Sequence, residues 1–323
     1  MKVLLVGFGV VGEGIAKILI EKNVGIKIIG ICEIDYSIQN PDGLYLEEIL
    51  DLKKSKGTFK SHPKAEIGKN AQRYIKELSA DVVVDVTPTN IDTGEPTLSH
   101  IKDALCAKKH VVTSSKGPLA LHYRELKDLS KKNNVKFLYE ATVGGCIPIM
   151  VLARSYFKCN TFKSIYGIVN GTTNYILTRM TNENAQLDQV LLEAQQLGIA
   201  EKDASYDIDG IDTACKIVIL ANEYFNMNVT YKDVCVKGIR TITPEFLQIA
   251  KKKGFAVKLI GSISDQKIDV APKLIPISHP LNVSGVYNAI TIKTDYTDDI
   301  TLIGYGAGKL ETASAVVNDI LSI

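Results

Sequence analysis

Apolar residues in the first 140 positions follow two alternating patterns. Short, mostly apolar runs lie at residues 2–7, 26–32, 81–88, 110–115 and 135–141. Longer stretches, such as residues 97–108 and 119–132, place apolar residues three or four positions apart. The runs predict buried strands and the stretches predict helices. With right-handed crossovers, this alternation predicts an α/β fold built on a doubly wound parallel sheet.

The pattern changes in the second half of the chain. We expect a strand in SIYGIVN, residues 164–170, then a helix in NGTTNYILTRM and another in LDQVLLEAQQLG. Alternating residues predict further strands of a mixed sheet at 256–264, 268–277 and 289–294, before a glycine turn and a last helix. The sequence therefore predicts a second domain, of α+β type, after residue 140.

The first predicted turn has the spacing G-x-G-x-x-G. Gly7, Gly9 and Gly12 lie between the first strand and the first helix. In that context the pattern is typical of a Rossmann-type dinucleotide site, where a pyrophosphate approaches the positive end of a helix. Glycines of an ordinary strand-to-helix turn are the alternative. We predict cofactor contacts at these glycines and at Val10 and Val11.

An acidic residue ends the second predicted strand. Glu33 follows Gly12 by 21 residues. A carboxylate there accepts hydrogen bonds from the adenosine ribose and repels a 2′-phosphate, which favours NAD over NADP. Lys54 and Lys56 lie in what we predict to be a charged loop. Either that loop folds over the cofactor and neutralises a phosphate, or its lysines form a solvated face.

Two later loops follow predicted strands at the edge of a parallel sheet where ligands bind. Thr87 and Pro88 follow the third strand, and Ser115 and Lys116 follow the fourth. We predict cofactor contacts at all four residues, with Lys116 directed at the reactive half of the cofactor. An ordinary exposed loop lysine is the alternative for Lys116.

The segment EKDASYDIDGIDTACK, from Glu201 to Lys216, concentrates acidic residues and ends on a lysine. Asp212 and Lys216 are four residues apart, so they share one face of a helix that begins at Ile211. The following IVILAN makes this helix apolar nearly all round, which predicts burial. Two interpretations fit the pair: a proton donor with its partner, or a structural ion pair.

Two turns carry polar residues with two interpretations each. Four polar residues, Asn170, Thr172, Thr173 and Asn174, lie at the start of a predicted helix, where they either cap it or line a polar substrate pocket. In the segment EATVGG, Glu140 and the carbonyl groups of a glycine turn match the oxygen ligands of a hard cation. From spacing alone, the same residues also fit an ordinary turn.

Composition excludes several classes of protein. Lys and Arg number 38 and Asp and Glu 36, for a net charge of +2 without long runs of one sign. This distribution does not favour nucleic acid or an anionic membrane as a partner. The six cysteines are far apart and never form C-x-x-C, which favours reduced thiols over disulfides or a metal site. Without a spanning stretch or a signal-peptide pattern, we expect a soluble, cytoplasmic protein.

Ordered blocks along nearly the whole chain resemble the homoserine dehydrogenase family. The blocks are TPTNIDTGEP, TSSKGPLAL, YEATVGG, NGTTNYIL, the run from Ala200 to Lys216, and GYGAG with TASAVV. The resemblance implies reversible NAD- or NADP-dependent reduction of L-aspartate 4-semialdehyde to L-homoserine, a step toward threonine, methionine and isoleucine. It also implies a homodimer, a nucleotide-binding domain of residues 1–139 with 300–323, and a substrate-binding, catalytic and dimerisation domain of residues 140–299.

The same resemblance implies roles for individual residues. Catalytic roles fall to Lys216, Asp212 and Lys116. Substrate contacts fall to Glu201, Asp207, Gly171 and Thr172, and one further cofactor contact falls to Gly306. A site for Na⁺ or K⁺ falls to Glu140 with the carbonyl groups of Val143, Gly145 and Ile147.

Some features depart from the family's usual pattern. The departures are Ser115, Cys146, Ala204 and Ile199, which leave the proposed catalytic groups intact but bear on the shape of the pocket. A dehydrogenase of another amino acid or short aldehyde is therefore an alternative. A nicotinamide-sensing binding protein is another, although it should lack the set of Lys116, Asp212 and Lys216. Because the chain ends after its last predicted helix, we expect no ligand-sensing extension of the kind that longer members carry.

Overall fold

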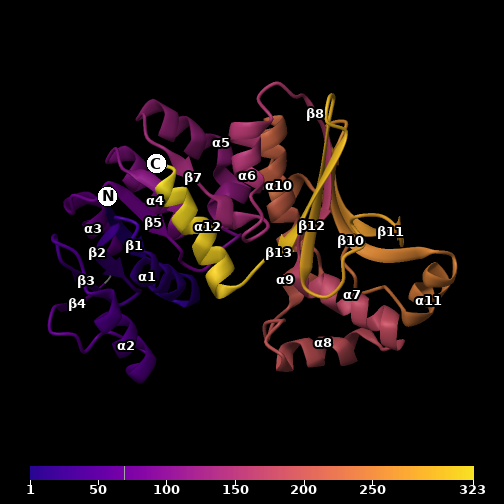
Figure 1. The fold of residues 1–323 in the computed structure, drawn as a ribbon, viewed down its shortest axis with the longest axis horizontal. Coiled ribbons are helices and arrows are strands. Elements are labelled where there is room, and N and C mark those ends of the chain that lie inside the picture. Colours follow the sequence, from indigo (N-terminus) through magenta and orange to yellow (C-terminus); the bar gives the residue numbers. More distant parts are fainter. Residues whose placement is uncertain (69) are drawn as a thin grey trace. The chain divides into compact units, whose positions relative to one another are not determined.

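The computed structural model describes residues 1–68 and 70–323, which fold into two compact units (Figure 1). The first unit comprises residues 1–145 and 308–323, and the second comprises residues 146–307. The chain thus leaves the first unit once and returns to it with its last helix. None of the helices formed by the described residues is long and apolar enough to cross a lipid bilayer.

A seven-stranded sheet forms the centre of the first unit. In order across the sheet, its strands are β4 (Ala65–Ile67), β3 (Tyr36–Gln39), β2 (Lys27–Cys32), β1 (Lys2–Val6), β5 (Val82–Asp85), β6 (His110–Thr113) and β7 (Phe137–Leu138). The five strands from β2 to β7 in this order are parallel, whereas β3 and β4 run antiparallel to their neighbours. The helices of this unit are α1 (Val10–Lys22), α2 (Leu46–Lys56), α3 (Ala71–Glu77), α4 (Thr97–Cys106), α5 (Gly117–Lys132) and α12 (Lys309–Leu321), with a 3₁₀ turn, η1 (Glu140–Thr142).

The predicted parallel sheet is confirmed, and the structure adds an antiparallel edge to it. The strands β3 and β4 have four and three residues, which is too short for a recognisable alternation. The structure also corrects the expectation of a charged loop around Lys54 and Lys56. Both lysines lie in α2, where Ile49 and Leu50 supply enough buried apolar surface to dock a largely polar helix.

The last helix joins the first unit by packing against α1 (Figure 1). A Cβ added at Gly14 would lie 2.7 Å from the backbone oxygen of Lys309 and 2.9 Å from Cβ of Ala313. The missing side chain therefore lets α1 and α12 approach closely. Lys309 also pairs with Glu13 at 2.5 Å, and Val316 contributes to the buried core of this unit.

A mixed six-stranded sheet forms the centre of the second unit. Across the sheet, its strands are β13 (Asp299–Tyr305), β12 (Tyr287–Thr294), β8 (Phe162–Ile168), β10 (Phe255–Ser264), β11 (Lys267–Pro276) and β9 (Cys235–Val236). The pairing of β9 with β11 is parallel, and the other neighbours are antiparallel. The helices are α6 (Ile149–Val151), η2 (Leu152–Tyr156), α7 (Gly171–Glu183), α8 (Leu187–Gln196), α9 (Ser205–Ile208), α10 (Ile211–Phe225), η3 (Tyr231–Asp233) and α11 (Pro244–Lys252).

The structure places residues 299–305 differently from the domain bounds that the family resemblance implies. They form β13, which pairs with β12 and belongs to the second unit, so the chain returns to the first unit at residue 308 instead of residue 300. Most residues of β13 are at least partly exposed on both sides. The strand therefore lacks the alternation of buried and exposed residues by which a strand is recognised.

Candidate active site

The glycine turn of the first unit has the packing of a dinucleotide-binding turn. Gly7 has a φ of +95°, which favours glycine, and a Cβ at Gly12 would lie 2.5 Å from the backbone oxygen of Gly7. Gly9 precedes α1, and a Cβ there would meet no atom within 4 Å. Val10 and Val11 form the first turn of α1 beside it. The residues thus fit a pyrophosphate, which would approach backbone N–H groups at the positive end of the helix.

Glu33 lies directly after β2, but it is not alone there. The Nζ atom of Lys53, from α2, lies 2.5 Å from Oε1 of Glu33, and both side chains are largely buried. Burial by itself lowers the pKa of Lys53, but the hydrogen bond and charge of Glu33 outweigh burial and raise it. The sequence pattern singles out Lys54 and Lys56, whereas the structure brings Lys53 to Glu33. Lys53 lies in the last turn of α2 among other lysines, so nothing in the sequence distinguishes it as the partner of Glu33.

The loops after β5 and β6 lie side by side in the first unit. Thr87 is half-buried, Pro88 is exposed and Ser115 is buried. Lys116 precedes α5, and its backbone N–H donates to Oγ1 of Thr89 at 3.3 Å. All four predicted cofactor residues of these loops therefore lie at the carboxyl edge of neighbouring strands, as expected.

In the second unit, Asp212 and Lys216 form a pair on α10. Oδ2 of Asp212 lies 2.7 Å from Nζ of Lys216, which also donates to the backbone oxygen of Val169 at 2.7 Å. Both side chains are largely buried. The helix that the sequence predicts from Ile211 therefore places the two groups together, and a third group from outside the helix fixes the lysine.

Asn170 connects this pair to a second carboxylate. Its amide nitrogen donates to Oδ2 of Asp212 at 2.9 Å and to Oδ1 of Asp207 at 2.6 Å. Its side-chain oxygen accepts the backbone N–H of Thr173 at 2.8 Å and so caps α7. Asn170 therefore caps α7 and joins two carboxylates at the same time, whereas its place in a substrate pocket stays a prediction.

Asp207 carries a carboxylate in an unfavourable environment. Burial raises the pKa of Asp207, and the nearby charge of Asp212 raises it further. Hydrogen bonds from Asn170 and Thr172 and the positive charge of Lys216 oppose the rise without cancelling it. The site therefore contains two neighbouring carboxylates for one lysine, which suits a ligand that brings a positive charge.

The remaining substrate residues lie at different distances from this cluster. Gly171 begins α7, where a Cβ would lie 2.8 Å from the backbone oxygen of Val286, and Oγ1 of Thr172 donates to the backbone of Ile199 at 3.2 Å. Glu201 is exposed.

The predicted cation residues occupy one continuous loop. Glu140 and Val143 are buried, Gly145 has a φ of +59°, and Ile147 follows as a buried residue of the second unit. The backbone N–H of Glu140 donates to Asp319 at 2.7 Å. No cluster of three or more His, Cys, Asp or Glu side chains suited to a metal ion occurs among the described residues.

Gly306 lies in the turn that follows β13. A Cβ at this position would overlap the side-chain amide of Asn288, so any larger residue would have to displace that amide. Asn288 lies on β12 and is fully buried. The turn is therefore held against the sheet of the second unit, with its backbone half-exposed.

Comparison with known families decides what kind of protein combines these two sites. Residues 7–140 match the homoserine dehydrogenase NAD-binding domain, and residues 148–321 match the homoserine dehydrogenase family model. The chain belongs to the homoserine dehydrogenase family. It is accordingly an NAD(P)-dependent oxidoreductase that acts on a CH–OH group.

Individual relatives agree with this placement over their whole length. A homoserine dehydrogenase of Methanocaldococcus jannaschii is 46% identical, with 100% of this chain and 98% of the relative covered. An NAD⁺-dependent homoserine dehydrogenase of Pseudomonas canavaninivorans is 36% identical, with 100% and 96% covered. The solved structure of a hyperthermophilic archaeal homoserine dehydrogenase in complex with NADPH is 32% identical and superimposes with a TM-score of 0.88, over 99% of this chain and 96% of that one.

The homoserine dehydrogenase assignment confirms the expected family, the Rossmann-type fold and a nicotinamide cofactor. The roles of individual residues stay predictions. Within the second unit, the structure brings together Asp207, Asp212, Lys216 and Thr172, and it adds Asn170 as the group that joins them.

Proposed function

We propose that this chain catalyses the reversible reduction of L-aspartate 4-semialdehyde to L-homoserine, a step toward threonine, methionine and isoleucine, with Lys216 as the group that moves the proton. The observation that carries this proposal is the buried contact of 2.7 Å between Lys216 and Asp212. An ammonium has three hydrogens. Its bonds to Asp212 and to the backbone of Val169 fix the direction of the remaining N–H.

The reaction requires a proton donor for an oxygen that becomes negative. When bound, the nicotinamide supplies or accepts the hydride. In the reductive direction, Lys216 donates a proton to the carbonyl oxygen of the substrate as negative charge develops there, and Lys116 stabilises the same charge. In the oxidative direction, Lys216 accepts the proton of the homoserine hydroxyl. Asp212 orients Lys216 and stabilises its ammonium form.

Asp207 and Glu201, which are not part of the Asp212–Lys216 pair, suit the amino group of the substrate. An amino acid brings an ammonium group, and Asp207 lies in a cluster with one lysine and two carboxylates. Binding of the ammonium would offset the burial and charge repulsion that raise the pKa of Asp207. We assign the ammonium to Asp207 with Glu201, and the neighbouring polar contacts to Gly171 and Thr172.

The cofactor residues of the proposal come from the first unit and from the turn after β13. Gly7, Gly9, Val10, Val11 and Gly12 would hold the pyrophosphate. Glu33 would accept the ribose hydroxyl groups, which favours NAD. Thr87, Pro88, Ser115 and Lys116 would hold the nicotinamide half, together with Gly306. The pairing of Lys53 with Glu33 moderates the preference, because it reduces the negative charge that a 2′-phosphate would meet.

A monovalent cation, Na⁺ or K⁺, is part of the same proposal. The buried carboxylate of Glu140 and the carbonyl groups of Val143, Gly145 and Ile147 are hard oxygen ligands of the required kind. Positive φ angles at Gly144 and Gly145 allow successive carbonyl groups to turn toward one point.

We further propose a homodimer formed by the second unit, in the cytoplasm. The edge strand β13 exposes Ile303 and Tyr305, and β11 exposes Leu274, by 53%, 44% and 51%. Exposed apolar residues on a sheet, next to an unpaired strand edge, are typical of an interface. Light scattering on purified protein should give twice the mass of 35.3 kDa.

The proposed reaction is tested by the initial rate of nicotinamide reduction with L-homoserine, with NAD and NADP run side by side at neutral to alkaline pH. We expect homoserine-dependent reduction with at least one cofactor. Other amino alcohols and short alcohols serve as controls for substrate class. If both cofactors bind and neither is reduced with homoserine, the proposed reaction is wrong.

A further inference from the structure

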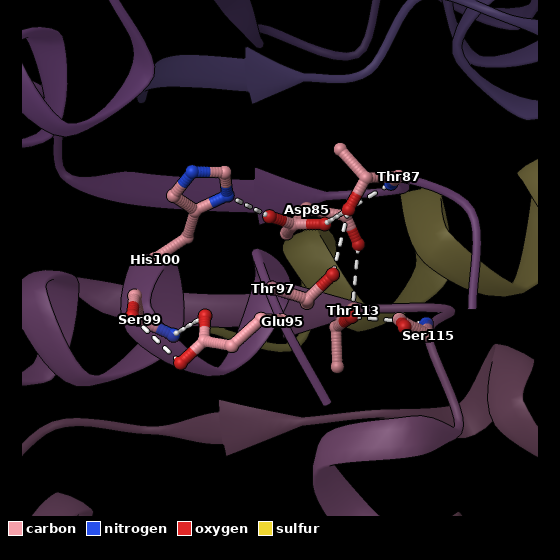
Figure 2. A network of polar contacts seen from close by, with 8 residues as sticks. All are labelled: Asp85, Thr87, Glu95, Thr97, Ser99, His100, Thr113 and Ser115. Carbon is pink, nitrogen blue, oxygen red and sulfur yellow. Dashed lines mark hydrogen bonds and ion pairs between the residues drawn. The ribbon is translucent and has the colours of Figure 1, made fainter. Parts of the chain in front are cut away.

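A polar network connects the two loops to which we assign the nicotinamide half of the cofactor, at Thr87 and at Ser115 (Figure 2). Its centre is Asp85, the last residue of β5, which is fully buried. Its carboxylate oxygen Oδ2 lies 2.8 Å from Nδ1 of His100, on α4, and His100 is also buried. A carboxylate only accepts hydrogen bonds, so Nδ1 of His100 carries the hydrogen in this contact.

The other carboxylate oxygen holds the first loop. Oδ1 of Asp85 accepts the backbone N–H of Thr87 at 3.0 Å and its hydroxyl at 2.5 Å. The Thr87 oxygen also lies 2.7 Å from Oγ1 of Thr97, at the beginning of α4 (Figure 2). The backbone of the loop after β5 is thus fixed by Asp85, and Asp85 is fixed by His100.

The same residue also holds the second loop, through its backbone. The backbone oxygen of Asp85 accepts the hydroxyl of Thr113 at 2.8 Å, and Thr113 in turn accepts the backbone N–H of Ser115 at 3.0 Å. Ser115 is buried, yet its own hydroxyl oxygen has no hydrogen-bond partner among residues 1–68 and 70–323. A buried hydroxyl without a partner is uncommon and calls for an explanation. A ligand group at this loop provides one.

The position in the sheet points to the nicotinamide half. The glycine turn follows β1, Glu33 follows β2 on one side of it, and the network follows β5 and β6 on the other side. A dinucleotide lies across the carboxyl ends of such strands, with its adenosine on the side of the acidic residue. The loops after β5 and β6 therefore face the opposite half.

We propose that Asp85 and His100 are positioning residues. Through the hydrogen bonds of Asp85 to Thr87 and Thr113, they fix the loops after β5 and β6, to which we assign the nicotinamide half of the cofactor. The inference rests on the proposed function, because it takes these loops to bind the nicotinamide half of NAD. Neither residue touches the cofactor in this account. His100 keeps the buried Asp85 carboxylate in place, and Asp85 sets the backbone at Thr87 directly and at Ser115 through Thr113.

The test compares the binding of NAD with that of ADP-ribose, which lacks the nicotinamide ring, by calorimetry on the whole protein. For His100→Leu, we expect the Kd of NAD to rise roughly tenfold, the scale of one lost hydrogen bond to a charged group, while the Kd of ADP-ribose stays unchanged. His100→Asn places an amide donor near the position of Nδ1 and should restore most of the NAD affinity. Equal changes for both ligands, or none, overturn the inference.

Two further variants keep the test decisive. Thr97→Val replaces His100→Leu in the test if that variant does not fold. It removes one hydroxyl, leaves Asp85 and His100 intact, and should give a smaller loss of affinity for NAD with no loss for ADP-ribose. Lys109→Met is the matched control, because buried Lys109 caps the carbonyl groups of Ile75 and Leu78 and lies outside the network. It should lower the stability of the protein without changing the ratio of the Kd of NAD to the Kd of ADP-ribose.

Failure of the inference is distinguishable from failure of the proposed function. If His100→Leu weakens the binding of NAD but not of ADP-ribose, and His100→Asn restores the NAD affinity, the inference stands even where homoserine gives no turnover. If homoserine is oxidised normally and the His100 and Thr97 variants bind both ligands like wild type, the inference is wrong and the proposed function stands.

Discussion

Asp212 and Lys216 meet one turn apart on α10 with 2.7 Å between Oδ2 and Nζ, and the backbone oxygen of Val169 holds the same Nζ from outside the helix. An ion pair of this kind usually contributes little stability when it is buried, because desolvation of both charges opposes their attraction. Its presence beside a second carboxylate, Asp207, is therefore better explained by chemistry than by folding.

The first prediction concerns Lys216→Met. The variant should fold and bind cofactor, yet lose roughly 10²- to 10⁴-fold in kcat, the usual contribution of a positioned proton donor. The matched control is Lys258→Met, which removes another buried lysine of the same unit that hydrogen-bonds Asn174 and Val283. The control should keep kcat close to wild type. Similar losses in both variants would mean that Lys216 acts only through stability.

The second prediction concerns Asp207→Asn. Burial and the charge of Asp212 raise the pKa of Asp207 above 3.8, so its ionised form is unfavourable in the folded protein. A carboxyl group with a raised pKa contributes stability below its ordinary pKa, and this contribution is lost as the pH rises through the folded value. The substrate-free variant should therefore melt higher than wild type at neutral pH, and the difference should shrink toward acid pH.

The same substitution should weaken the binding of homoserine. Loss of one charged hydrogen bond to the ammonium predicts a rise in KM of roughly tenfold or more. Steady-state kinetics and thermal melting on the same preparation test both effects. A variant that melts lower at neutral pH, or that keeps its KM, contradicts the role given to Asp207.

The sequence predicts the elements that carry these residues better than it predicts their partners. The period of α10 places Asp212 and Lys216 on one face, and a strand followed by Gly7, Gly9 and Gly12 fixes the position of the turn. Both signals are local. The hydrogen bond from Asn170 to Asp212 joins residues that are 42 positions apart in the sequence. It forms because tertiary packing brings the first turns of α7 and α10 close together. No spacing in the sequence encodes that convergence.

The same reasoning explains the residues that the sequence pattern assigns differently. Lys53 is one of several lysines in LEEILDLKKSK. It becomes the partner of Glu33 only because α2 packs against the unit through its own buried residues Ile49 and Leu50. His100 lies on the helix 97–108 that the sequence predicts, but a single histidine in an apolar pattern gives no hint of its buried partner Asp85. Local periodicity gives the face of a helix, whereas tertiary packing decides what that face meets.

The third prediction concerns pH and Lys258. Burial lowers the pKa of Lys258 from 10.5 to about 8. The unfolded chain therefore binds more protons than the folded protein between these values, and stability rises with pH across this window. Relative to Lys258→Met, the wild-type protein should gain stability as the pH rises from about 8 to 10.5. Denaturant unfolding of both proteins across this range tests the sign, and a falling difference contradicts it.

The last prediction concerns the choice between NAD and NADP. Glu33→Ala removes the charge that repels a 2′-phosphate and releases Lys53, whose Nζ lies 2.5 Å from the carboxylate in the wild-type protein. We expect kcat/KM for NADP relative to NAD to rise roughly five- to thirtyfold, which corresponds to about 1–2 kcal/mol.

Lys53→Met leaves Glu33 unpaired and should lower the same ratio. Lys54→Met is the control, because Lys54 is exposed on the same helix and pairs with Asp51 at 3.8 Å. If Lys54→Met changes the ratio as much as Lys53→Met, the phosphate is attracted by the general charge of α2, and the Glu33 to Lys53 pair does not select the cofactor.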